Sequence, residues 1–181
     1  MKGLVHCIVV LGLAGLTGCV TSRAGPPEPD RAQNEPLETD LRDAGGQRRA
    51  TAIVSQIGDS LRVRVEAEGL APGAYGAHLH AVGRCDPPGF ESAGPHWNPT
   101  GQQHGKDNPQ GMHKGDLPNL LVGTDGRGSF EFTVLDAWLL GGGRTLLDAD
   151  GAALVIHSRA YDYRTDPSGN SGPRIACGLL R

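Results

Sequence analysis

The spacing of the histidines constrains the fold of this chain more than any other feature. His78 and His80 stand two residues apart in an apolar run. In a β-strand alternate side chains share one face, so a strand here would point both imidazoles to the same side, as two ligands of one ion require. The sequence therefore predicts a strand that presents a pair of ligands to a metal site.

Five further residues extend this pattern. His96, His104 and His113 follow at near-even intervals in a stretch rich in Gly, Pro and Asn, and Asp116 comes soon after His113. Three ring nitrogens and one carboxylate oxygen suit tetrahedral zinc. His157 ends a later apolar run and supplies a distant ligand to whichever site is incomplete. An isolated histidine is usually a packing or surface residue, but the combined spacing predicts two adjoining metal sites.

Length and composition limit the architecture. The chain has 181 residues, with 28 glycines and 13 prolines but few aromatic residues. These values are typical of one turn-rich domain and leave no room for a second enzyme domain. The formal net charge is −3. We therefore expect no nucleic-acid partner, because the basic footprint of such a protein is absent.

The N-terminus is similar to a bacterial lipoprotein signal. Lys2 precedes an apolar stretch that is too short to span a membrane comfortably, and Leu16-Thr17-Gly18-Cys19 places small residues before a cysteine. An ordinary secretion signal that ends near a cysteine is the alternative. We expect residues 1–18 to be a signal peptide, Cys19 to carry lipid, and residues 19–34 to form a flexible polar tether.

This leader predicts a location. The protein is expected on the periplasmic side of the cell envelope, in contact with the membrane through its lipid anchor only. Val20, rather than aspartate, follows the cysteine. By similarity to Gram-negative lipoproteins, that residue favours the outer membrane.

The four cysteines agree with export. Cys7 leaves with the leader and Cys19 is acylated, so Cys85 and Cys177 remain as one candidate disulfide. An oxidising compartment would preserve such a bridge. Two buried free thiols are the alternative.

Beyond the tether, short apolar segments alternate with turn signals. Leu61, Val63 and Val65 alternate with charged residues, which is the pattern of a half-buried antiparallel strand. We therefore expect an all-β sandwich or flattened barrel. The expected strands are Leu37–Leu41, Arg49–Ile57, Leu61–Leu70, Tyr75–His80, Leu120–Thr124, Ser129–Val134, Leu154–His157 and Ile175–Leu180.

Two long irregular stretches interrupt these strands, at Val82–Asn119 and Ser158–Pro173. Structureless loops of such length are usually functional. The histidines fall on these loops and on the strand ends beside them. The loops are therefore the expected position of the site within a domain over residues 35–181.

Four motifs in a fixed order carry a resemblance to a known family. They are Gly76-Ala77-His78-Leu79-His80, Ser92-Ala93-Gly94-Pro95-His96-Trp97-Asn98-Pro99, His113-Lys114-Gly115-Asp116-Leu117 and Gly172-Pro173-Arg174-Ile175-Ala176-Cys177-Gly178. Over roughly residues 35–181, the chain resembles a bacterial periplasmic copper/zinc superoxide dismutase in its lipoprotein-anchored form. The resemblance implies an eight-stranded Greek-key sandwich, a copper and a zinc ion bridged by one histidine, and a disulfide that anchors the long loop.

The resemblance also implies the ligands, position by position. His96 would be the shared ligand, because an imidazole has two ring nitrogens. Imidazole suits copper, and zinc, which keeps one oxidation state, would orient His96. Copper would be held by His78, His80, His96 and His157, and zinc by His96, His104, His113 and Asp116.

Two residues are the expected catalytic ones. His96 would deliver a proton to the bound peroxide, and Arg174 would hold the incoming superoxide anion with a fixed planar cation. From the pattern alone, Arg174 is equally well explained as a surface arginine in an ion pair. Its Gly-Pro-Arg-Ile-Ala-Cys context favours the catalytic role.

One position departs from the family. After the last copper histidine the family has Ala-Asp-Asp, whereas this chain has Ala160-Tyr161-Asp162. The first of those aspartates accepts hydrogen bonds from one copper histidine, here His78 or His80, and one zinc histidine, here His104. A neutral phenol with one oxygen cannot replace that carboxylate. We therefore predict weakened zinc retention, unless Asp162 shifts by one residue to fill the gap.

Two functions stay open from the sequence. The first is dismutation of superoxide to dioxygen and hydrogen peroxide, which would protect the cell envelope. The second is a non-catalytic copper- and zinc-binding lipoprotein that stores or passes on copper. The departure from the family at Tyr161 favours this second function. The histidine set disfavours a third class, an Ig-like binding module. A homodimer also stays open, because its interface has no signature separable from ordinary surface.

Overall fold

The computed structural model describes residues 35–181. The predicted signal peptide, Cys19 and the tether lie outside the described residues. The described part is built of β-strands and one short 3₁₀ helix, η1 (Glu91–Ala93), which confirms the all-β expectation. In this part of the chain, no helix has the length and apolar character needed to cross a membrane.

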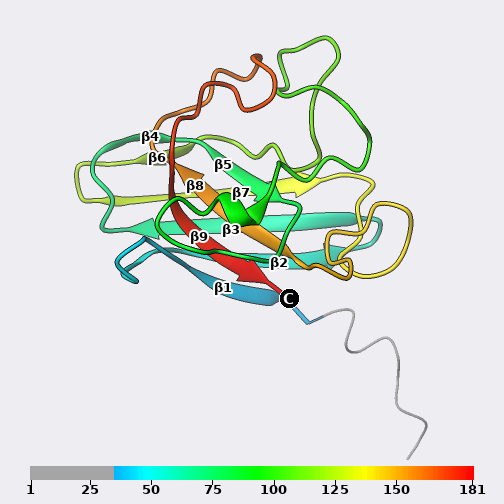
Figure 1. Cartoon of the computed structure of the whole chain (residues 1–181), viewed down its shortest axis with the longest axis horizontal. Helices are drawn as coiled ribbons and strands as arrows, with labels where there is room; N and C mark the ends of the chain where they lie inside the picture. The colour runs from blue at the N-terminus through cyan, green and yellow to red at the C-terminus, as the bar shows by residue number, and fades with distance from the viewer. Residues whose placement is uncertain (1–34) are drawn as a thin grey trace, which may run out of the picture.

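The strands form a curled antiparallel sheet (Figure 1). Its order is β5-β8-β9-β1-β2-β3-β7, and β4 pairs with β6 in a second, two-stranded sheet. The C-terminal strand β9 thus lies between β8 and β1, a non-sequential order typical of Greek-key folds. The bounds are β1 (Leu37–Arg42), β2 (Arg48–Ile57), β3 (Ser60–Glu68), β4 (Gly73–Tyr75), β5 (Ala77–His80), β6 (Leu120–Val122), β7 (Arg127–Val134), β8 (Ala152–His157) and β9 (Arg174–Leu180).

The predicted strands are confirmed, with ends that differ by at most two residues and with one larger difference at Gly76. The single strand expected over Tyr75–His80 is divided there into β4 and β5, which belong to different sheets. Gly76 donates its N–H to the carbonyl of Arg159 and accepts from the N–H of His157, both at 2.8 Å. A Cβ at this position would lie 3.0 Å from the Cβ of Ser171. When β4 and β5 are counted as one bent strand, the fold has the eight strands that were expected.

The core follows from strand alternation. Leu61, Val63 and Val65 of β3 are fully buried, and the charged residues between them face solvent. In contrast, β8 is buried along its whole length. The first long loop covers its outer face, because Phe90 and η1 pack against β8 there.

A disulfide fixes that loop to the sheet. Cys85 and Cys177 are joined, with their Cα atoms 5.7 Å apart, which confirms the candidate bridge. Cys177 lies in β9 and belongs to the same small apolar cluster as Phe90 and Ala93. The bridge therefore holds the start of the loop beside the strands that carry the histidines.

The two long loops lie together at one end of the sheet. One connects β5 to β6 and the other connects β8 to β9. Figure 1 shows the later part of the first loop, in green, and the second loop, in orange to red, above the strands. Main-chain contacts join them, since Asp107 N–H donates to the carbonyl of Tyr163 at 2.9 Å. Residues far apart in the sequence are thereby brought to one place.

Removing the disulfide is expected to destabilise the domain. The bridge closes a sequence separation of 92 residues, for which chain-entropy models give about 4.6 kcal/mol. Urea denaturation of the metal-free oxidised protein and of the Cys85→Ser/Cys177→Ser double variant measures this difference. Free energies of unfolding that agree within about 1 kcal/mol would contradict the prediction.

Candidate metal centre

Strand β5 is the scaffold of the site. The Leu79 N–H donates to Gly115 at 2.9 Å, and its carbonyl accepts from the N–H of Trp97 at 2.8 Å. Gly115 in turn donates to the carbonyl of Trp97 at 2.8 Å. A Cβ at Gly115 would come within 2.4 Å of the Leu79 oxygen, so only glycine permits this approach. The segments around His96 and Asp116 are thus held together along the edge of β5 that does not pair with β8.

The first histidine group lies at the ends of β5 and β8. His78, His80, His96 and His157 are buried, and one ring nitrogen from each lies within 4.8 Å of the others. Nδ1 of His80 lies 2.9 Å from the carbonyl oxygen of Gly94. Because a carbonyl can only accept, this nitrogen carries the proton and Nε2 keeps its lone pair. These are the residues expected to hold copper.

His157 is oriented in the same way. Its Nδ1 lies 2.9 Å from the carbonyl oxygen of Gly172 and 3.0 Å from the hydroxyl oxygen of Ser171. Its buried Nε2 has no hydrogen-bond partner. Outer hydrogen bonds of this kind fix the tautomer and the ring plane of a metal ligand.

The second group is arranged around Asp116. Its Oδ1 atom lies 2.9 Å from Nδ1 of His104 and 3.3 Å from Nδ1 of both His96 and His113. Its Oδ2 atom accepts from the N–H of Gly105 at 2.8 Å and of His113 at 3.1 Å. Three nitrogens around one carboxylate oxygen match the donor set of tetrahedral zinc.

The two groups adjoin closely enough to share members. One nitrogen each of His78, His96 and His104 and an oxygen of Asp116 all lie within 4.8 Å of one another. Judged by these distances alone, His78 would take the place of His113 in the second group. The rings of His78 and His96 are stacked at 3.9 Å, which explains this overlap. The contacts of Asp116 favour His113, because it meets Asp116 through both its ring and its main chain.

Burial sets the protonation of these groups. It lowers the pKa of His78 and His80 well below the usual value, and nearby imidazoles lower both further. Burial likewise lowers the pKa of His96, and that of His157 to about 4. Burial would raise the pKa of Asp116, but the close nitrogens of three histidines hold it well below its usual range. The first group therefore presents neutral imidazoles, and the second group presents one carboxylate, which are the forms that bind metals.

Buried side-chain atoms that lack a hydrogen-bond partner indicate whether these residues suit metal ions. Within residues 35–181, every buried side-chain nitrogen or oxygen without a hydrogen-bond partner belongs to a histidine ring. Such atoms are costly unless something binds them. The residues of both groups therefore fit copper and zinc. The atoms are Nδ1 and Nε2 of His78, Nε2 of His80, Nδ1 and Nε2 of His104, Nδ1 of His113 and Nε2 of His157.

Arg174 lies beside the first group. It lines an open cleft together with His96 and His157. Its guanidinium donates to the carbonyls of Phe90 and Gly94, each at 2.7 Å. These bonds hold the cation at the cleft and leave further N–H donors free, since a guanidinium has five.

Tyr161 is buried against both groups. Its ring centre lies 4.8 Å from that of His78 and 5.0 Å from that of His104, and its hydroxyl donates to the carbonyl of Leu117. Burial raises the pKa of this phenol far above its usual value, so it stays neutral. An aromatic ring thus occupies the position where the family has a carboxylate.

Asp162 does not move into that position. Its carboxylate is exposed and accepts hydrogen bonds from the backbone of Arg164 and Thr165, the hydroxyl of Thr165 and the amide of Asn170. These bonds shape a turn of the second loop. The alternative that Asp162 fills the gap is therefore not what this structure shows.

Sequence reasoning missed Asn119, which joins the two loops. Its side chain accepts from the N–H of Tyr161 at 3.0 Å and donates to the carbonyl of the same residue at 2.9 Å. Its own N–H donates to the hydroxyl of Tyr163 at 3.0 Å. An asparagine at a loop end carries no signal of such a distant pairing.

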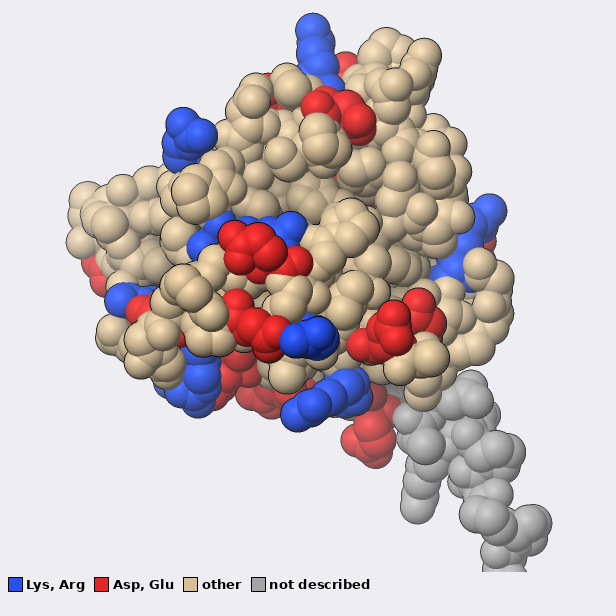
Figure 2. Space-filling model, viewed as in Figure 1, with Lys and Arg blue, Asp and Glu red and all other residues tan. Residues whose placement is uncertain are grey.

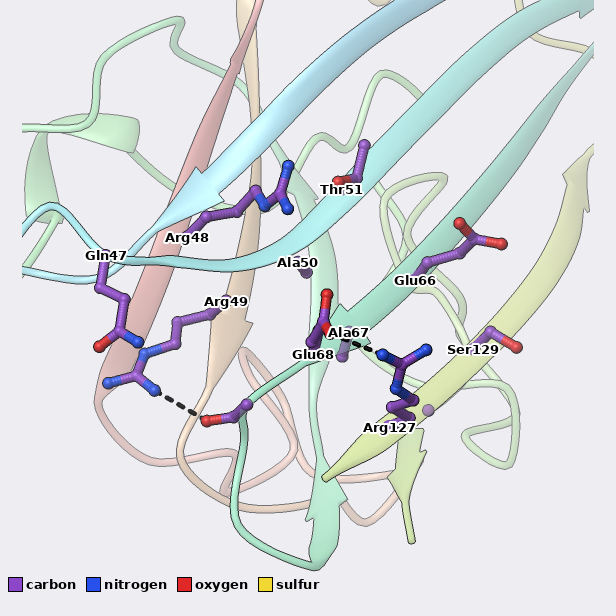
Figure 3. Close-up of a pocket in the computed structure, with 12 residues that line it drawn as sticks. Gln47, Arg48, Arg49, Ala50, Thr51, Glu66, Ala67, Glu68, Arg127 and Ser129 are labelled. Atoms are coloured by element: carbon purple, nitrogen blue, oxygen red, sulfur yellow. Dashed lines mark hydrogen bonds and ion pairs between the residues drawn. The ribbon is translucent and has the colours of Figure 1, made fainter. Parts of the chain in front are cut away.

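A second hollow lies away from the histidines, over β2, β3 and β7 (Figure 3). No histidine or cysteine lines it. Arg49 is paired with Asp43 at 2.8 Å, and Arg127 with Glu68 at 2.7 Å. These charges stabilise the sheet surface, and we assign no ligand to the hollow.

Basic and acidic side chains are interspersed on the face shown in Figure 2. Elsewhere on the sheet surface, Arg62 and Glu131 form an exposed cross-strand pair at 3.4 Å. Exposed pairs of this kind contribute little to stability. That face presents mixed charge rather than a continuous basic stripe.

Fold and site together define a β-sandwich protein with two adjoining metal sites. Comparison with known proteins agrees, because the family model for copper/zinc superoxide dismutase (SODC) matches residues 49–180. The chain belongs to the copper/zinc superoxide dismutase family. This membership and the histidine cluster with Asp116 identify copper and zinc as the metals that the centre can bind.

Bacterial relatives are similar over most of the domain. The superoxide dismutase-like protein YojM of Bacillus subtilis (strain 168) is 48% identical over 124 residues, which are 67% of this chain but 63%, under two thirds, of YojM. Superoxide dismutase (Cu-Zn) 1 of Aquifex aeolicus (strain VF5) is 39% identical over 154 residues, covering 83% of this chain and 90% of that protein. The crystal structure of a SOD-like protein from Bacillus subtilis gives a TM-score of 0.75 at 40% identity and covers 80% of this chain and 97% of that one.

The metal-free protein should lose stability in acid. Unfolded His157 takes up a proton near its ordinary pKa of 6.5, whereas burial lowers the folded pKa to about 4. As pH falls through this window the unfolded state binds the proton first, so His157 alone contributes a loss of up to about 3 kcal/mol. Denaturant unfolding at pH 7 and pH 4 measures the loss, and His157→Gln should reduce it. A free energy of unfolding that stays constant over this range would contradict the prediction.

Restoring the carboxylate should strengthen zinc binding. In Tyr161→Asp the outer nitrogens of His78 and His104 regain an acceptor, so the zinc dissociation constant should fall about 10- to 100-fold. Competition with a chelator measures it. Tyr161→Phe is the control, because it keeps the ring and adds no acceptor. Equal zinc affinities in Tyr161→Asp and the unmodified protein would refute the prediction.

Proposed function

We propose that this protein dismutates superoxide at a copper ion that His96 bridges to zinc. One observation carries the proposal: the ligand nitrogens of the first group converge beside an open cleft that Arg174 also lines. An anion in that cleft would meet a fixed cation and the copper site together. We assign copper to His78, His80, His96 and His157, and zinc to His96, His104, His113 and Asp116.

The reaction requires an anion site, an electron carrier and a proton source, because two superoxide anions and two protons give one dioxygen and one hydrogen peroxide. Copper, when bound, supplies the one-electron couple. Arg174 would hold the anion through the donors that Phe90 and Gly94 leave free. Nδ1 of His96 faces Asp116 at 3.3 Å, so its other ring nitrogen is the atom that would hold and deliver a proton at the cleft.

Non-catalytic metal binding is the second candidate. Tyr161 supports it, because the ring removes an acceptor that the family places between the two metal sites. The similarity to a protein named superoxide dismutase-like also supports it. Under this alternative the same residues would bind copper, but the loaded protein would not accelerate the decay of superoxide.

We also propose a place in the cell envelope. A signal peptide at residues 1–18, lipid on Cys19 and a tether over residues 19–34 would hold the domain on the periplasmic side, and Val20 favours the outer membrane. There it would protect envelope components from superoxide. Radioactive palmitate should label the protein in cells but not its Cys19→Ala variant, and equal labelling of both would contradict the lipid anchor.

Pulse radiolysis tests the activity. The domain loaded with copper and zinc should remove superoxide at close to the diffusional rate. Arg174→Gln should lower that rate constant about 10- to 100-fold, because a focused positive charge raises association rates by such factors. Arg164→Gln is the matched control, since it removes the same charge from an exposed position outside the cleft lining.

Two results would count against the proposal. A copper-loaded protein that removes superoxide no faster than buffer would favour the non-catalytic candidate. An equal loss of rate in both arginine variants would mean that Arg174 acts through net charge alone, not through its place in the cleft.

A further inference from the structure

His104 and His113 are the two expected zinc histidines that are not shared with the copper group. In each, the outer ring nitrogen is the one that points away from Asp116, and the two outer nitrogens have different surroundings. Both rings direct Nδ1 toward Asp116, so Nε2 is the outer atom in each. Nε2 of His104 is buried without a partner. A Cβ built on Gly169 would lie 2.7 Å from it and 2.8 Å from the Cβ of Tyr161. This nitrogen therefore lies close to Gly169 and Tyr161 and meets no acceptor.

His113 has a carboxylate instead. Its Nε2 lies 3.9 Å from Oδ1 of Asp166, a residue of the second loop. The same oxygen accepts the main-chain N–H of His104 at 2.7 Å. One carboxylate oxygen is therefore anchored on one zinc histidine and faces the outer nitrogen of the other.

We propose that Asp166 is a positioning residue of the zinc site, which accepts a hydrogen bond from Nε2 of His113 and so gives this site an outer carboxylate at a second zinc histidine, where Tyr161 gives His104 none. The inference rests on the proposed zinc assignment. An ion bound at Nδ1 leaves the proton of His113 on Nε2, where it is a strong donor. A shift of about 1 Å would shorten the distance of 3.9 Å to a normal hydrogen bond.

Other carboxylates do not compete for this role. Within residues 35–181, Asp116 and Asp166 are the only carboxylates within 4.0 Å of a ring nitrogen of the zinc histidines. Asp162, the neighbour that the sequence pointed to, is bonded to its own loop. Asp116 meets the inner nitrogens and is itself a ligand in the assignment.

The charge of Asp166 also needs an explanation. It lines the same cleft as Arg174, and its side chain is 47% exposed. A negative charge there works against the attraction of a superoxide anion. Steering of the substrate therefore does not account for this residue, whereas a contact with His113 does.

Zinc affinity is the first test. Asp166→Asn keeps an oxygen that can accept the His104 N–H but removes the charge that strengthens the bond from His113. The zinc dissociation constant, from competition with a chelator, should rise about 10- to 100-fold. Asp148→Asn is the matched control, because Asp148 lines the same cleft and has no contact with a histidine ring within 4.0 Å. Equal dissociation constants in the two variants would overturn the proposal.

The second test observes the hydrogen bond itself. Co²⁺ placed in the zinc site shifts the imidazole N–H protons of its ligands far from the other NMR signals. In the unmodified protein the Nε2 proton of His113 should exchange slowly with water, and in Asp166→Asn it should exchange faster. A loss of loop packing alone would leave no such selectivity for one proton.

The two proposals can fail separately. Shifted imidazole signals with the same exchange rate in both proteins would overturn the role of Asp166 but keep the zinc site. An unmodified protein that gives no shifted imidazole signals with Co²⁺ would overturn the zinc assignment, and the role of Asp166 with it.

Discussion

Buried imidazole nitrogens without hydrogen-bond partners govern the rest of this structure. Among the described residues they are the only buried side-chain nitrogens or oxygens left without a partner, and each costs about 1–3 kcal/mol in that state. Burial also lowers the pKa of His78 and His80 and so keeps their lone pairs free of protons. The fold thereby creates a penalty that metal binding offsets.

The loops that carry these rings are ordered by bonds that need no metal. Tyr161 and Asn119 are paired through main chain and side chain, and the hydroxyl of Tyr161 reaches the carbonyl of Leu117. In the family a carboxylate would link the loops through the metal ligands themselves. Here a tyrosine gives a similar docking of the loops but leaves His104 without an outer acceptor. The change reaches both groups of the centre, because Tyr161 also lies against His78 and both ring nitrogens of that residue have no hydrogen-bond partner.

Much of this could be predicted from the sequence, because the signals were local. The alternation around Val63 predicted β3, and the two-residue spacing of His78 and His80 predicted a ligand-bearing strand. The division at Gly76 could not be predicted, since it depends on the carbonyl of Arg159 from a distant loop. The contact of Asp166 with His113 likewise joins residues with no shared pattern. Loop-to-loop contacts of this kind exist only once the sheet brings the loops together.

The central claim is that this chain holds two metals on a shared histidine. Anomalous X-ray diffraction at the copper and zinc absorption edges, on crystals of the loaded protein, tests it directly. We expect a copper peak among His78, His80 and His157, a zinc peak beside Asp116, and the His96 ring between them. A single peak, or a zinc peak remote from Asp116, would rule out two metals on a shared histidine.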